Sequence, residues 1–105
     1  MFVAGMVGWT AEEKFETGDF VEQFRQSLVN TVAVLAEGGA GPKHICRMTM
    51  YFTDKQLYLS RLPEVGQAYR DVIGKNFPTM AAVQVVALME DRAKVEIETT
   101  AVVPV

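Results

Sequence analysis

Three charged side chains recur at every second position near the carboxyl end of the chain: Lys94, Glu96 and Glu98. On an extended strand this spacing places all three on one face. A carboxylate on such a face can orient a water molecule or accept its proton, as a general base does. The same pattern describes the partly solvated face of an ordinary sheet, and spacing alone favours that structural interpretation of Glu96.

The other ligating or nucleophilic candidates are isolated in the sequence. His44 is the only histidine, and no second histidine or cysteine lies at the spacing of a metal site, so we expect a surface histidine and no bound metal. Cys46 is the only cysteine, so no intrachain disulfide can form. It alternates with Met48 and Met50, which favours a buried, inert thiol over a nucleophile.

Composition narrows the possible partners and the compartment. Ten Lys and Arg against 13 Asp and Glu give a formal net charge of -3, which opposes binding to nucleic acid. No apolar run approaches the roughly twenty residues that cross a bilayer, and the apolar start at residues 1–9 lacks the basic segment of a secretion signal. We therefore expect a cytoplasmic protein of one domain over residues 1–105, with neither nucleic acid nor membrane as partner.

The elements that must position these side chains begin with two helices. From Asp19 the apolar residues recur at helical spacing as far as the glycine pair at 38–39, and Asp19 with Glu22 forms a capping pair. A second helix is predicted over residues 62–73, because apolar residues repeat at helical spacing and a proline stands in its first turn. A short turn at residues 56–60 leads into it.

Four segments are typical of strands because they are rich in apolar, β-branched and aromatic residues. They cover residues 1–7, 44–53, 79–89 and 93–103. The last two are joined by a charged turn and predict a hairpin. The predicted order is β-α-β-α-β-β, an α+β domain.

One predicted strand needs more cover than the chain provides. Both alternating faces of residues 79–89 are apolar, with Gln84 as the only polar interruption. Two helices can cover only one face of a four-stranded sheet. We therefore expect other copies of the chain to cover the second face, in a ring of subunits.

Five short segments follow one another along nearly the whole chain: Phe2-Val3-Ala4-Gly5, Leu35-Ala36-Glu37-Gly38-Gly39-Ala40-Gly41, Tyr51-Phe52-Thr53-Asp54, Asn76-Phe77-Pro78 and Lys94-Val95-Glu96-Ile97-Glu98-Thr99-Thr100-Ala101-Val102. Together they resemble the Rid (RidA/YjgF) family. The resemblance implies a chorismate-mutase-like α+β fold, with a mixed sheet and two helices on one face. It also implies a homotrimer with small-molecule clefts at the subunit interfaces. Family members usually carry a further strand before the position of Phe2, so this chain resembles a form shortened at its N-terminus.

The best-understood members hydrolyse reactive imine and enamine intermediates, such as 2-aminoacrylate, to a keto acid and ammonia without a metal or an organic cofactor. Glu96 matches the family glutamate that positions the attacking water. Four other positions depart from the family pattern. Met80 stands where deaminating members have an arginine that grips the substrate carboxylate, and Ala82 replaces a cysteine. Ala4 replaces a serine or threonine, and Gly66 replaces an asparagine.

Two further positions belong to the implied site. Gly5 is the first glycine of the family pattern, and Trp9, in the loop that follows, either flanks the cleft or caps the sheet edge. Because methionine cannot replace a guanidinium fork, the resemblance implies a hydrolase of a small imine or enamine other than 2-aminoacrylate. The alternative is a non-catalytic homotrimer that binds a small metabolite or a partner enzyme.

Overall fold

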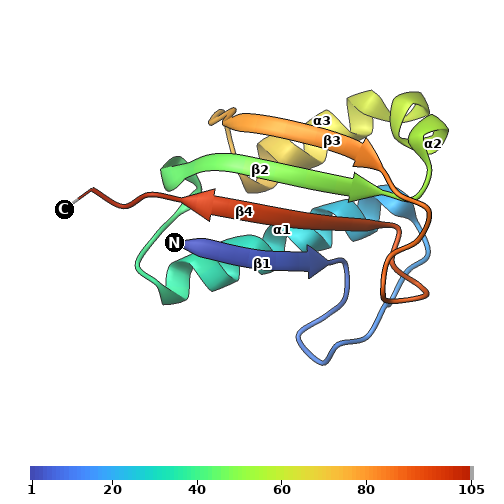
Figure 1. Ribbon diagram of the computed structural model, residues 1–105, viewed down its shortest axis with the longest axis horizontal. Coiled ribbons are helices and arrows are strands. Elements are labelled where there is room, and N and C mark those ends of the chain that lie inside the picture. The colour runs from blue at the N-terminus through green and yellow to red at the C-terminus, as the bar shows by residue number, and fades with distance from the viewer. Residues whose placement is uncertain (105) are drawn as a thin grey trace.

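The computed structural model describes residues 1–104, which form a four-stranded sheet with helices packed behind one of its faces (Figure 1). In chain order the elements are β1 (Phe2–Val7), α1 (Phe20–Glu37), a 3-10 turn (Pro42–His44), β2 (Ile45–Phe52), α2 (Lys55–Ser60), α3 (Leu62–Val72), β3 (Thr79–Gln84) and β4 (Val95–Ala101). The α+β class, with two long helices on one side of a mixed sheet, is confirmed.

The strand order in the sheet is β1-β4-β2-β3. Strand β4 runs antiparallel to both β1 and β2, whereas β2 and β3 are parallel. Parallel neighbours need a crossover connection, which α2 and α3 provide. As a result, β3 and β1 are the two edges, and β4 lies inside the sheet (Figure 1).

The predicted hairpin of residues 79–89 and 93–103 is wrong. Strand β3 ends at Gln84, β4 begins at Val95, and β2 lies between the two. Alternating apolar residues identify a strand but not its neighbour, and here the helical crossover pairs β3 with β2. The apolar pattern continues beyond Gln84 into a loop in which Val86 and Met89 are almost fully exposed.

Helix α1 begins and ends where its sequence signals predict. The Asp19 side chain accepts a hydrogen bond from the backbone N–H of Glu22 at 3.0 Å, which caps the first turn. Phe20, Phe24 and Leu28 follow at one-turn spacing and are buried against the sheet. The predicted lead-in to the second long helix is a separate helix, α2, capped in the same way by Asp54.

The core lies between the helices and one face of the sheet. Met48, Met50 and Phe52 of β2 and Val95 and Ile97 of β4 are buried there. The alternate residues of the strands point to the opposite, uncovered face. That open face carries Arg47, Tyr51, Ala81, Val83, Glu96, Glu98 and Thr100. The expectation that this chain covers only one face of its sheet is confirmed.

The prediction of a buried thiol at Cys46 is wrong for the single chain. The register between β2 and β4 shifts between Ile45 and Arg47, so Cys46 leaves the regular alternation and becomes exposed. Its Sγ donates to the backbone oxygen of Thr100 at 3.4 Å. In residues 1–104, none of the helices is long and apolar enough to cross a membrane.

Candidate functional site

Glu96 lies on the open face of β4, paired with Tyr51 of β2 on one side and Val7 of β1 on the other. Beside it, the register of β1 shifts between Val3 and Met6, and this irregular stretch contains Gly5. A Cβ placed on Gly5 would lie 2.8 Å from the Glu96 Cδ, closer than carbon atoms approach without bonding. Glycine at this position therefore leaves the space that the half-buried Glu96 carboxylate occupies.

The surroundings leave that carboxylate available. Among residues 1–104, no side chain or backbone group donates a hydrogen bond to the Glu96 carboxylate, and no cation lies within ion-pairing distance of it. Ala4 lies next to Gly5 and lines a neighbouring hollow of about 380 Å³ on the same open face. Gly5, Ala4 and Glu96 therefore form one group, which we call the open-face group.

Met80 lies on the other side of the sheet. It pairs with Met48 in the parallel register of β2 and β3, so its side chain points toward the helices. There it lines a cavity of about 190 Å³ whose opposite wall is α3, which contributes Val65 and Gly66. Met80 and Gly66, 14 residues apart in the sequence, therefore face one cavity, which we call the α3 pocket.

The outer wall of the α3 pocket is a stacked aromatic pair. The rings of Tyr69 and Phe77 lie 5.5 Å apart with their planes 19° from parallel. The Tyr69 hydroxyl donates to the backbone oxygen of Asn76, and burial raises the pKa of that hydroxyl. The Asn76 amide in turn donates to the backbone oxygens of Pro42 at 2.8 Å and Ile45 at 3.0 Å. These bonds fix the turn that leads into β3.

Arg70 brings a charge to this apolar cavity. It is the charged residue among those that line the α3 pocket, and it stands one helical turn after Gly66. A Cβ at Gly66 would lie 3.3 Å from the Arg70 Nη1, so the guanidinium folds back over the bare backbone there. Its other terminal nitrogen, Nη2, donates to the Gln67 side chain at 3.3 Å. Sequence reasoning missed Arg70, Tyr69 and Phe77, although the Asn76-Phe77-Pro78 motif marked the turn.

The two remaining predicted residues lie outside both groups. Ala82 is two residues beyond Met80 on β3 and lines an adjoining hollow of about 180 Å³ with Phe52 and Tyr58. Trp9 follows β1, and its ring packs 5.7 Å from that of Phe15. Trp9 is not among the residues that line the α3 pocket or the hollow beside Ala4.

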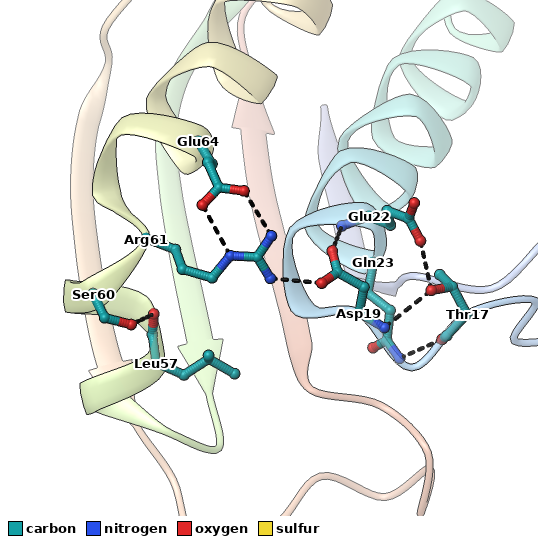
Figure 2. A network of polar contacts seen from close by, with 8 residues as sticks. All are labelled: Thr17, Asp19, Glu22, Gln23, Leu57, Ser60, Arg61 and Glu64. Carbon is teal, nitrogen blue, oxygen red and sulfur yellow. Dashed lines mark hydrogen bonds and ion pairs between the residues drawn. The ribbon is translucent and has the colours of Figure 1, made fainter.

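A polar network holds the helices that carry the pocket (Figure 2). Arg61, at the start of α3, donates to Asp19 at 2.6 Å and to both carboxylate oxygens of Glu64. Asp19 caps α1, so a single guanidinium joins the first turns of the two long helices. The bond from Arg61 holds the pKa of the Asp19 carboxyl below its ordinary value.

Gln23 extends this network into the loops. Its side chain is fully buried and makes three hydrogen bonds to the backbone, of 2.9 to 3.0 Å, to Thr17, Arg92 and Lys94. The network thereby fixes the segment before α1 and the segment before β4 at one point. It positions both the α3 pocket and the strand that bears Glu96.

The predicted site residues therefore fall on opposite faces of the sheet. Met80 and Gly66 share the α3 pocket, whereas Gly5, Ala4 and Glu96 share the open face. Within one chain the sheet separates the two groups. As for metals, residues 1–104 bring together no set of three His, Cys, Asp or Glu side chains that could hold an ion.

A family model and two curated proteins match nearly the whole chain. A family model described as "Endoribonuclease L-PSP" matches residues 1–103. TdcF of Escherichia coli, which carries the name "Putative reactive intermediate deaminase TdcF", is 30% identical over 102 residues that cover 97% of this chain and 78% of TdcF. The human 2-iminobutanoate/2-iminopropanoate deaminase is 25% identical over 103 residues, covering 97% of this chain and 72% of the human protein.

Solved structures show the same relationship in three dimensions. YyfB of Yersinia pestis, a member of the Rid protein family, superposes with a TM-score of 0.87 at 27% identity, covering 98% of this chain and 77% of YyfB. The structure of E. coli TdcF with bound serine gives a TM-score of 0.82 at 29% identity, covering 98% and 80% of the two chains. The match over residues 1–103, together with these relatives, confirms the resemblance seen in the sequence: the chain belongs to the endoribonuclease L-PSP family, that of the Rid (RidA/YjgF) proteins.

Proposed function

We propose that the protein is a homotrimer that hydrolyses a small reactive imine or enamine in clefts between its subunits. The observation that carries the proposal is the division of the predicted site residues between two faces of each chain. The open-face group offers a carboxylate without an ion partner, and the edge strand β3 carries Met80 and Ala82. If the β3 edge of one subunit meets the open face of the next, the two groups form one cleft.

The surface of the chain favours such an assembly. All six residues of β3 are exposed, and two of them, Ala81 and Val83, lie on the open face of the sheet. Phe2, at the other edge of the sheet, is 88% exposed. Apolar surface of this extent is typical of a subunit interface. We expect sedimentation equilibrium at micromolar concentration to give the mass of a trimer, and a monomer there would contradict the proposal.

The proposed reaction needs only water and one carboxylate. Water adds to the carbon of the C=N bond, and the Glu96 carboxylate takes one water proton and passes it to the nitrogen, which gives a carbinolamine. The hydroxyl proton of the carbinolamine then moves to the nitrogen by way of the same carboxylate, the C–N bond breaks, ammonia leaves, and a carbonyl compound remains. Glu96 is suited to this role because Gly5 leaves space beside its carboxylate.

The identity of residue 80 restricts the substrate. Deaminating relatives are expected to hold an amino-acid-derived carboxylate with an arginine at this position, and a thioether cannot replace that fork. A charge-assisted contact contributes about 1.5 to 3 kcal/mol, so we expect at least about tenfold slower hydrolysis of 2-aminoacrylate than in an arginine-bearing relative. Ammonia and pyruvate release from 2-aminoacrylate supplied by a dehydratase measures this. An equal rate would contradict the assignment.

The proposal is tested by ammonia release from a panel of imines generated by an amino acid oxidase. We expect Glu96→Gln, which keeps the shape and removes the base, to lower the rate about a hundredfold. Glu37→Gln, at the exposed end of α1, is the matched control and should leave the rate unchanged. Both variants should sediment like the unmodified protein.

A non-catalytic ligand-binding trimer is the second candidate, and the α3 pocket favours it, because this apolar cavity lies on the opposite side of the sheet from Glu96. Ammonia release that is equal with the unmodified protein, with Glu96→Gln and without protein would support the second candidate over the first.

A further inference from the structure

We propose that the α3 pocket binds a small arylcarboxylic acid, with the aromatic ring among the apolar side chains and the carboxylate held by the Arg70 guanidinium. The inference rests on the proposed function, because it assigns a ligand class to the site that Met80 and Gly66 are expected to line.

The volume and the walls fit an aromatic ring. The cavity measures about 190 Å³, and a cavity of roughly 150 Å³ with apolar walls is sufficient for benzene. Phe24, Met50, Val65 and Met80 supply apolar surface. The Tyr69 hydroxyl already donates to Asn76, so the aromatic wall presents its ring rather than a free donor. A polar group placed among these apolar side chains would lose its bonds to water without replacement.

The Arg70 guanidinium at the edge of the pocket favours the binding of an anion. In residues 1–104, Arg61 binds Asp19 and Glu64, and Arg25 binds Asp71, but no carboxylate lies within ion-pairing distance of Arg70. The contact of Arg70 with the neutral Gln67 amide is long, at 3.3 Å. A guanidinium presents parallel N–H groups that match the two oxygens of a carboxylate.

Gly66 connects the charge to the cavity. Glycine in a helix interior destabilises the helix by about 1 kcal/mol relative to alanine, so its presence mid-helix needs a packing reason. Here a methyl group would stand 3.3 Å from the Arg70 Nη1, so the guanidinium lies directly beside residue 66. Glycine at residue 66 thus lets the Arg70 guanidinium pack against the helix backbone at the edge of the cavity.

The experiment is a titration of the full chain with phenylacetate, followed by NMR of methionines labelled with ¹³C at the methyl group. Phenylacetamide, the neutral isostere, is the matched ligand. We expect phenylacetate to shift the methyl signals of Met50 and Met80, which line the pocket, and not those of Met1 and Met89, which are exposed elsewhere. Phenylacetamide should bind about fivefold more weakly, the range expected of a charge pair at a partly exposed site.

The variants identify the anchor. Arg70→Gln should weaken phenylacetate binding about fivefold and remove the preference over phenylacetamide, whereas Lys75→Gln, a nearby loss of the same charge, should change neither. Three results would each overturn the inference: an unchanged preference of Arg70→Gln for phenylacetate over phenylacetamide, signal shifts confined to Met1 and Met89, or no binding at phenylacetate concentrations on the order of 10 millimolar. The proposed function fails separately, through ammonia release that does not depend on Glu96.

Discussion

The two ends of α3 each carry an arginine, and the surroundings of the two differ. Arg61, at the start of the helix, donates to two carboxylates, one of which caps α1 (Figure 2). Arg70, in the last turn, lies over an apolar cavity and, among the described residues, has the Gln67 amide as its hydrogen-bond partner. The Arg61 guanidinium is held by two carboxylates of the fold, whereas the Arg70 guanidinium retains N–H groups that can bind a ligand.

This difference separates the parts of the molecule that hold the fold from those that can bind. The network around Arg61 ties together α1, α3 and two loops, so its groups have few donors or acceptors to offer a ligand. The α3 pocket and the open face contain charged groups that have no ion-pair partner among residues 1–104, Arg70 and Glu96. Substitutions in the first region should change stability, and those in the second should change binding or rate.

The largest stability effect is expected for Gln23→Leu, which removes all three side-chain bonds of Gln23 to the backbone. Because the groups left without partners are partly or fully buried, we expect the free energy of unfolding to fall by about 2 to 4 kcal/mol. Urea unfolding measures it. Gln26→Leu is the control, since Gln26 is less buried and, within residues 1–104, its side chain bonds to Asn30 alone, and the variant should lose less than about 1 kcal/mol. Equal losses would show that the network does not hold the loops.

A smaller loss is expected for Asp19→Ala, which removes the cap of α1 and should cost about 1 kcal/mol, or a fall in Tm of about 4 to 8 °C. Asp19→Asn keeps a capping oxygen and should cost less. Because Arg61 lowers the pKa of Asp19 in the folded state, the ionised carboxyl stabilises the protein above its unfolded pKa. That contribution is lost as pH falls below about 4. The Tm of the unmodified protein should therefore fall more steeply with decreasing pH there than the Tm of Asp19→Asn. Parallel acid profiles would contradict the role of this pair.

The fold was largely predictable because its elements carry local signals. The capping pair at Asp19 and Glu22 and the glycine pair at 38–39 located α1 closely. The pairing of the strands was harder to predict, since the alternation of apolar residues indicates a strand but not which strand lies beside it. The helical segment between β2 and β3 was a usable signal, because a connection of that length favours parallel pairing over the hairpin that the short turn before β4 suggested.

The candidate site was predictable only in part. Family motifs identified Glu96, Gly5, Met80 and Gly66, but nothing in them showed that the sheet separates the first two from the last two. Arg70 was missed because Gln67, Arg70 and Asp71 read as an ordinary solvated helix face. Its function as a pocket residue depends on contacts between α3 and β3 that only the folded chain contains.

The smallest stability effect is expected for Arg70→Gln, at the opposite end of α3 from Arg61. Since the fold gives the Arg70 guanidinium no carboxylate among the described residues, removing its charge should shift Tm by less than about 2 °C. Arg61→Gln should lower Tm by more, because it leaves Asp19 and Glu64 without their cation. Differential scanning calorimetry of the two variants, with and without phenylacetate, measures both properties together. We expect the ligand to raise the Tm of Arg61→Gln, which keeps all the residues that line the pocket, and to leave that of Arg70→Gln nearly unchanged. A Tm loss in Arg70→Gln as large as that in Arg61→Gln would place Arg70 among the residues that hold the fold.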